Sequence, residues 1–141
     1  MDVVLLSLKL LHISGAIVWA GGTVFLVALT AWATRQSVET RTLFARATSA
    51  MSGFVFGPAS LATIIGGIGL AVRGEYGNQL WIQWGMGAVL ATIIVGVVLI
   101  RPVQAAAVRG EHRGARLLVL QSLNLLILAS AVVAMVFKPT M

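Results

Sequence analysis

The sequence contains no cysteine among its 141 residues. This absence excludes disulfide bonds, zinc sites with cysteine ligands, iron–sulfur clusters and covalently attached haem of the c type. Charge is also scarce, because Asp, Glu, Lys and Arg make up only 10% of the chain, against about 25% in a typical soluble domain. Since 59% of the residues are hydrophobic, the chain cannot cover a water-facing surface, and we expect a membrane protein.

Acidic residues are few and lie at or beyond the ends of the apolar runs. The four of them are Asp2, Glu39, Glu75 and Glu111. Inside a membrane they cannot form a carboxylate pair, a proton relay or a metal cluster, which argues against a hydrolase and against a transporter with an acidic coupling site. The net charge of +6 comes mainly from arginines at the ends of apolar runs, not from a basic stripe interleaved with aromatics, so we expect no nucleic-acid partner.

Four apolar runs predict a single integral membrane domain over residues 1–141. A membrane-spanning helix needs about 20 apolar residues, and four such segments fit the chain. The first run is long and has no small-residue cleavage site, so we expect a retained first span rather than a cleaved signal. The predicted spans are about 4–33, 53–72, 80–100 and 117–137.

Prolines and a basic segment set the expected boundaries. Residues 35–46 predict the start of an amphipathic helix that continues into the second span. The residues expected on one side of this helix are Leu43, Phe44 and Ala47. Pro58 predicts a kink or the entry of the second span, because it lacks a backbone N–H. Arg101 and Pro102 predict the end of the third span.

The arginines favour one orientation in the membrane. Seven of them lie in the connections after the first and third spans, whereas the opposite side holds only Lys9, Arg73 and Lys138. Because cytoplasmic connections carry the excess of Lys and Arg, we expect these two connections in the cytoplasm and both termini outside. The predicted location is the bacterial inner (plasma) membrane, as a multi-pass protein in a lipid bilayer.

Small residues recur every four positions in two of the spans. They are Ala59, Thr63 and Gly67 in the second span and Ala88, Thr92 and Gly96 in the third. Such spacing lets helix backbones approach closely in a membrane. The predicted fold is therefore all-α, an up-down-up-down transmembrane four-helix bundle with both termini outside.

The strongest candidate for a functional side chain is His12. It lies within the first apolar run, three residues after Lys9, and a helix places both on one face. An ionisable side chain inside a membrane is costly unless a partner compensates it. A neutral imidazole can bind haem iron, zinc or copper, and we predict His12 as a ligand of haem b. The structural alternative is a hydrogen bond to a neighbouring helix, for instance to a carbonyl freed at Pro58.

A second axial ligand would have to lie at the depth of His12. This residue is about 12 Å below the outer end of its span, at 1.5 Å per residue, and Met86 in the third span lies at a similar depth. Histidine and methionine are a known axial pair of haem, which makes Met86 a candidate metal ligand. Core packing is the alternative for Met86. His12 of a homodimer partner would also complete a six-coordinate iron.

Other side chains near this depth have two interpretations each. Lys9 either extends to the outer headgroups or pairs with a haem propionate. Trp19 lies deeper and is a candidate to stack on the porphyrin. Trp81 and Trp84 are predicted as interfacial anchors, with lining of the porphyrin as the alternative.

Polar residues elsewhere have structural interpretations. The fourth span carries Gln121, Ser122 and Asn124 in its arginine-rich half, where we predict hydrogen bonds between helices. Gly66, Gly67 and Gly69 are predicted as helix packing rather than a phosphate loop. His112 lies among arginines in a connection, and we predict that it is solvated.

The face formed by Lys9, His12, Gly15, Trp19 and Gly22 resembles a superfamily of small four-helix bacterial membrane proteins. It includes the copper-resistance D family, a family of integral membrane proteins of unknown function, and the bacterial membrane protoporphyrinogen oxidase family. The chain is most similar to the family of unknown function. The likeness continues at Arg46, at 56–59, at 66–69, at Arg101–Pro102 and at 135–139.

The resemblance implies haem b at His12, because the first-span histidine of the oxidase family is associated with that cofactor. The oxidase family also has a lysine early in its third span, whereas residues 81–86 contain none here. Its Asn-Glu pair in the last span is replaced by Asn124 and Leu125. These differences argue against protoporphyrinogen oxidation.

We therefore expect a b-type haem-binding membrane protein with a redox or electron-transfer role towards quinone or a partner complex. One alternative is a non-catalytic structural subunit of a larger membrane complex, which binds no metal. The other is copper handling, which requires several methionines or histidines along one path. With five Met and two His in the whole chain, such a path is hard to build.

Overall fold

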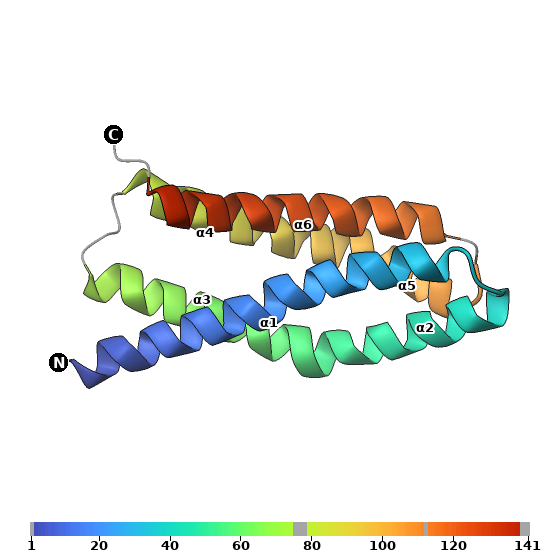
Figure 1. Cartoon of the computed structure of the whole chain (residues 1–141), viewed down its shortest axis with the longest axis horizontal. Coiled ribbons are helices and arrows are strands. Elements are labelled where there is room, and N and C mark those ends of the chain that lie inside the picture. Colours follow the sequence, from blue (N-terminus) through green and yellow to red (C-terminus); the bar gives the residue numbers. More distant parts are fainter. Residues whose placement is uncertain (1, 75–78, 112, 139–141) are drawn as a thin grey trace.

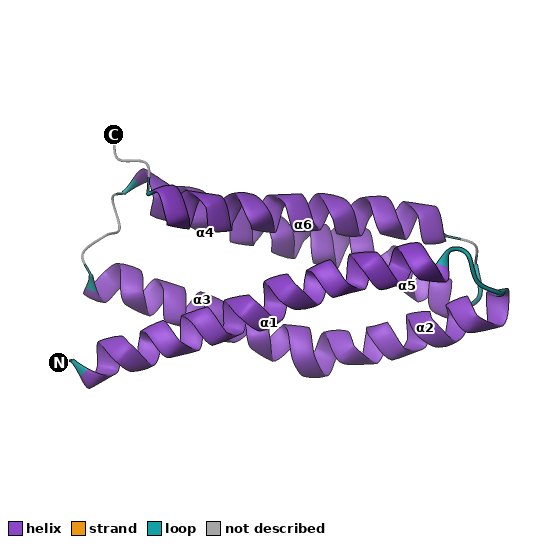
Figure 2. Ribbon diagram, viewed as in Figure 1, coloured by secondary structure: helices purple, strands orange, loops and turns teal. Residues whose placement is uncertain are grey.

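The computed structural model describes residues 2–74, 79–111 and 113–138. In these residues every regular element is a helix, as Figure 2 shows. Four continuous helical stretches are long and apolar enough to cross a membrane: Val3–Ala33, Val38–Arg73, Leu80–Val108 and Gly114–Phe137. They run alternately up and down, so the start of the first and the end of the last lie together (Figure 1). The predicted all-α four-helix membrane bundle is confirmed.

We call this end of the bundle the terminal end. The opposite end, where the first helix joins the second and the third joins the fourth, is the arginine-rich end (Figure 1). The first stretch is α1 (Val3–Ala33) and the last is α6 (Gly114–Phe137). The two middle stretches each contain a π-helical segment, and their parts are α2 (Val38–Met51), η1 (Ser52–Phe56) and α3 (Gly57–Arg73), then α4 (Leu80–Ile94), η2 (Val95–Ile100) and α5 (Arg101–Val108).

Both prolines inside these stretches follow a π-helical segment. Pro58 and Pro102 each lie in the first turn of the helix that comes next. In the widened turns the backbone bonds span five residues, from Gly57 N–H to Ser52 O and from Arg101 N–H to Gly96 O. Each helix therefore continues past its proline, which cannot donate a bond itself.

The two prolines do not interrupt their helices. The second stretch bends between α2 and α3 (Figure 1), and Pro58 lies in the first turn of α3. The third stretch continues past Arg101 and Pro102 as α5 to Val108, although these residues were predicted to end the third span. The helix can continue because the π-helical bonds of η2 replace the regular backbone bond that proline cannot donate.

The segment that follows residue 35 begins a helix that continues into the second stretch, as predicted, and the buried side of this helix consists of small residues. α2 runs into η1 and α3 without a break, and its buried residues are Ala45 and Thr48. Leu43 is 69% exposed. In a membrane an outward-facing leucine meets apolar lipid, while small residues such as Ala45 allow close packing between helices. Hydrophobicity therefore does not mark the inner side of α2.

The four stretches meet around Trp19 of α1. Its indole packs with Ala59 of α3 and Leu128 of α6, and Val89 of α4 lies against the same cluster. Elsewhere the contacts are pairwise: α1 packs mainly against α3 and α6, α4 against α6, and α2 against α5. The apolar centre of the bundle is thus a single small cluster at mid-height.

Between Trp19 and the terminal end, α1 and α3 touch through their backbones. A Cβ atom added at Gly15 would lie 2.7 Å from the carbonyl oxygen of Ala59 and 2.8 Å from the backbone nitrogen of Thr63. Nearer the terminal end, Gly69 of α3 makes room for the side chain of Leu8 of α1. Ala59 and Thr63 are thus at a close helix contact, as their four-residue spacing predicted.

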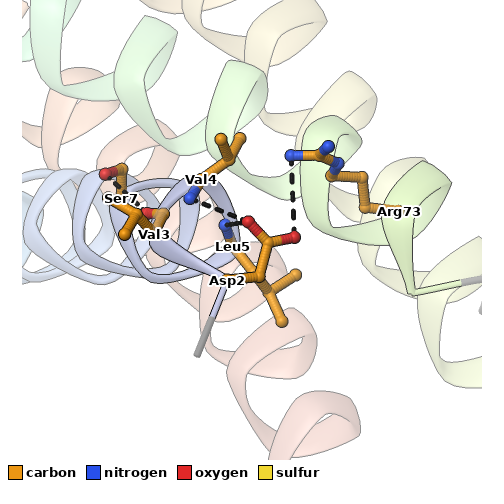
Figure 3. Close-up of polar contacts among 6 residues, drawn as sticks. All are labelled: Asp2, Val3, Val4, Leu5, Ser7 and Arg73. Carbon is orange, nitrogen blue, oxygen red and sulfur yellow. Dashed lines mark hydrogen bonds and ion pairs between the residues drawn. The ribbon is translucent and has the colours of Figure 1, made fainter.

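The start of α1 is fixed to the end of α3 by one carboxylate, as Figure 3 shows. Asp2 caps α1 by accepting hydrogen bonds from the backbone N–H groups of Val4 (3.0 Å) and Leu5 (3.4 Å). Its second oxygen lies 3.8 Å from Arg73 at the last turn of α3. Because both partners are about half exposed, the cap contributes more to this helix end than the ion pair does.

At the arginine-rich end, Glu111 joins two arginines in the connection between α5 and α6. Its carboxylate oxygens lie 2.9 Å from Arg109 Nη2 and 3.2 Å from Arg113 Nη2. The hydrogen bond from Arg109, together with the positive charges of both arginines, lowers the pKa of Glu111 from 4.5.

We predict that replacing Gly15 with Ala destabilises the bundle. The added methyl group would press on backbone atoms of α3, which cannot move as a side chain does, so the expected loss is about 1–3 kcal/mol. Unfolding in detergent micelles measures it. Gly21→Ala is the control, because nothing lies within 4 Å of a Cβ there, and it should be neutral or stabilising. Equal losses in both variants would contradict the close contact.

We also predict a small pH-dependent contribution of Glu111 to stability. A carboxyl group with a lowered folded-state pKa stabilises the fold above its unfolded pKa, and this contribution disappears as pH falls through the folded value. Wild type should therefore melt above Glu111→Gln at neutral pH and low salt, and the difference should close well below pH 4.5. A difference that persists at the lowest pH would show another cause.

Candidate functional site

His12 lies on the face of α1 that packs against α3, between Leu8 and Gly15. Its side chain is partly buried, and its Nδ1 atom lies 2.7 Å from the backbone carbonyl oxygen of Thr63. A carbonyl can only accept a hydrogen bond. The proton of the neutral imidazole is therefore on Nδ1, and the lone pair is on Nε2.

Two glycines of α3 make the space in which this imidazole lies. A Cβ at Gly66 would come within 2.7 Å of the backbone nitrogen of His12 and within 2.9 Å of its Cα. A Cβ at Gly67 would lie 3.0 Å from both Cε1 and Nδ1 of the ring. The glycines that the sequence suggested as packing residues thus bring the backbone of α3 close to His12.

The partner of His12 is a carbonyl of the neighbouring helix, as the structural alternative proposed. It is not a carbonyl freed by Pro58, because Thr63 lies inside α3, beyond the first turn that holds Pro58. A helical carbonyl keeps a second lone pair, which can accept the imidazole proton. No sequence signal points to this partner, since every residue carries a carbonyl, although Gly66 and Gly67 indicate where the backbone is accessible.

The hydrogen bond at Nδ1 fixes the tautomer and the orientation of the ring. Histidines that bind a metal through one nitrogen commonly donate the other N–H to a carbonyl or a carboxylate. Nε2 of His12 is free to act as a ligand or an acceptor in this arrangement. The geometry is therefore compatible with both the structural interpretation and the ligand interpretation of His12.

The other predicted site residues lie in different surroundings. Lys9 is exposed on α1, one turn nearer the terminal end than His12. Trp19 is 7% exposed and packs in the central cluster with Ala59 and Leu128. Met86 is 50% exposed on α4, which packs against α6, whereas α1 packs against α3 and α6. A similar depth in the bundle therefore does not place the Met86 side chain next to His12 of the same chain.

Both tryptophans predicted as anchors lie near the terminal end. Trp81 bonds to Gln79, and the ammonium group of Lys138 lies 5.7 Å from the centroid of its ring. Trp84 is 57% exposed and donates a hydrogen bond of 3.4 Å to Ser130 Oγ. The indole nitrogens of both residues are hydrogen-bonded, and the exposed ring of Trp84 can meet lipid, as expected of a side chain at a membrane boundary.

The predicted hydrogen bonds between helices are missing at two oxygens of α6. Gln121 and Asn124 are buried, but Gln121 Oε1 and Asn124 Oδ1 have no hydrogen-bond partner. Ser122 is half buried beside them. His112 lies outside the described residues. Among the residues that the structure describes, no three His, Cys, Asp or Glu side chains gather to hold a metal ion.

Comparison with family models, curated proteins and solved structures gives no match for this chain. The resemblance to the four-helix superfamily therefore stays a prediction, and the functional argument depends on the geometry around His12.

We predict that the neutral His12 imidazole carries its proton on Nδ1 in bilayers. Solid-state ¹⁵N NMR of histidine-labelled protein should show a protonated Nδ1 and an unprotonated Nε2 for His12, since Thr63 O is the acceptor. Gly67→Leu should disturb this signal, because its side chain would displace the ring. A proton found on Nε2 of the wild type would contradict the arrangement.

Proposed function

We propose that this chain is a b-type haem-binding protein of the bacterial inner membrane, with His12 as an axial ligand and a redox or electron-transfer role. The observation that supports the proposal is the hydrogen bond of 2.7 Å from His12 Nδ1 to the carbonyl of Thr63. It leaves Nε2 with a lone pair inside a membrane-spanning helix, and Nε2 is a common metal-binding atom of histidine. An imidazole in such a segment is costly without a compensating partner.

Four residues of the chain would hold or orient one ligand of a haem. Thr63 orients His12 through its carbonyl, and Gly66 and Gly67 leave room for the ring. The hydrogen bond from Nδ1 to the Thr63 carbonyl would raise the basicity of Nε2 and hold the imidazole in one orientation. When bound, haem b would supply reversible one-electron chemistry, with quinone or a partner complex as the exchanging molecule.

We propose that His12 of another copy of the chain would supply the second ligand. Met86 is the other candidate of the sequence, but it lies half exposed on a helix that packs mainly against α6. A homodimer would give two equivalent imidazoles, each held by its own Thr63 carbonyl. Lys9, exposed one turn nearer the terminal end, is the candidate to pair with a haem propionate.

The proposed orientation has the arginine-rich end in the cytoplasm. At that end, Arg35, Arg109 and Arg113 lie in the connections and Arg41 lies in the first turns of α2, and Lys and Arg are enriched on the cytoplasmic side of membrane proteins. His12 then lies in the outer half of the bilayer. Electron exchange would accordingly involve a quinone or a partner domain near the outer face.

We predict that the protein purified from haem-replete cells shows a Soret band that His12→Ala abolishes. His112→Ala is the matched control, because it removes the other histidine of the chain and should leave the band intact. A colourless wild type would reject haem binding and favour the role of a structural subunit. Loss of the band in both variants would show that it does not report on His12.

A second set of variants identifies the sixth ligand. If the second imidazole comes from another copy, Met86→Leu should leave the low-spin spectrum unchanged, and the coloured protein should elute as a dimer. A spectral change in Met86→Leu would instead assign the methionine. Each variant should also melt at the temperature of the wild type, since a misfolded bundle would lose the Soret band whatever its ligands are.

A further inference from the structure

Buried polar side chains are concentrated in one half of the bundle. Of those in the described part of the chain, all but Thr63 lie between the central Trp19 cluster and the arginine-rich end. These residues, which we call the polar seam, are Thr23, Thr30, Thr48, Thr92, Gln104, Gln121 and Asn124. They come from α1, α2, α4, α5 and α6, so polar groups from several helices face one another in this half.

Part of the polar seam is satisfied within the protein. Thr23 donates to the carbonyl of Trp19, and Thr92 to that of Ala88, each at 2.8 Å. Gln104 donates to Thr48 Oγ1 at 3.2 Å. These bonds are the usual solution for a hydroxyl or an amide inside a membrane helix.

Three oxygens of the polar seam have no partner. They are Thr30 Oγ1, Gln121 Oε1 and Asn124 Oδ1, and the exposed fractions of their residues are 3%, 5% and 8%. Buried polar atoms are almost always hydrogen-bonded, to protein or to ordered water. Two of the three are amide oxygens, which only accept hydrogen bonds, so the missing partner must be a donor.

The register of α1 and α6 brings these oxygens near one another. The two helices are antiparallel and pair Trp19 with Leu128 at mid-height. Near the arginine-rich end, a Cβ at Gly114 would lie 3.0 Å from Thr34 Cγ2. Between these two contacts, Asn124 lies at the level of Thr23, and Gln121 lies between the levels of Thr23 and Thr30.

A cavity at the arginine-rich end is lined in part by Thr30, the residue that carries the first of these oxygens. Its lining includes Thr30, Thr34, Arg41 and Arg113, and its volume is about 40 Å³. A buried water molecule needs roughly 10–15 Å³ of such space, so the cavity accommodates a few waters. Thr30 belongs both to the cavity lining and to the set of unpartnered buried groups.

We propose that water enters through this cavity and occupies the polar seam, donating hydrogen bonds to Thr30, Gln121 and Asn124. The two kinds of neighbouring groups select water over an ion. Glu111 lines the cavity together with Arg41 and Arg113 and is ion-paired with Arg113, so these three side chains leave a net positive charge that disfavours a metal cation. The amide oxygens deeper in the bundle cannot bind an anion. Water is small and neutral, and it both donates and accepts hydrogen bonds. It therefore suits the groups along the whole path from the cavity to Gln121 and Asn124.

The hydrated region ends inside the membrane. Trp19, Ala59 and Leu128 close the bundle with apolar surface at mid-height. His12 lies beyond this cluster, two turns nearer the terminal end. The polar seam is therefore an inlet open on one side and not a continuous channel, and it does not depend on the haem proposed at His12.

The test is water-edited solid-state NMR of the wild-type protein in lipid bilayers. Polarisation transferred from mobile water should reach the side-chain amides of Gln121 and Asn124 nearly as fast as the guanidinium of Arg41. The side chains of Leu128 and Val89, in the central cluster, should receive it several-fold more slowly. Build-up at both amides as slow as at Leu128 would overturn the proposal.

A variant pair then tests whether the amides hold the water. Gln121→Leu should slow the build-up at Asn124 towards that of Leu128, because a bound water loses one of its partners. Ser122→Ala is the matched control, next to Gln121 and outside the polar seam, and should leave Asn124 unchanged. Equal build-up at Asn124 in both variants would overturn the shared site, and an unchanged His12 Nδ1 signal shows that each variant is folded.

Discussion

The closeness of α1 and α3 is the constraint on which the rest of this bundle depends. At Gly15 and Gly66 no side chain separates the two helices, and their backbone atoms are in contact. Dispersion forces between closely packed helices hold them together in a membrane. Hydrophobic burial adds no attraction there, because lipid is as apolar as the side chains. The same closeness brings the imidazole of His12 within hydrogen-bonding distance of a backbone carbonyl.

The apolar cluster around Trp19 divides the bundle into halves of different chemistry. On the terminal side of Trp19, α1 and α3 pack backbone to backbone, and the polar atom of interest is Nε2 of His12. On the arginine-rich side, side-chain amides and hydroxyls face inward from several helices. The apolar cluster at Trp19 separates them, so an imidazole that can bind a metal and a seam that can hold water need not interfere with each other.

Sequence patterns were incomplete where a membrane protein differs from a soluble one. The pattern of Leu43, Phe44 and Ala47 indicated a helix but not its buried side, and Leu43 is largely exposed because lipid accepts it as readily as a core does. Pro102 was expected to end the third span, and the π-helical segment before it lets the helix itself continue. Met86 was matched to His12 by depth alone, which says nothing about which helices are neighbours.

The sequence by itself determined the number of long helices, their up-down order, the small-residue contact at Ala59 and Thr63, and the unusual position of His12. These follow from composition and from periodicity along one helix, which local residues control. Only the tertiary structure decided that Thr63 O is the partner of His12, that Met86 faces outward, and that Gln121 and Asn124 lack partners. Such facts depend on which helix faces which, and residues far apart in the chain set that arrangement jointly.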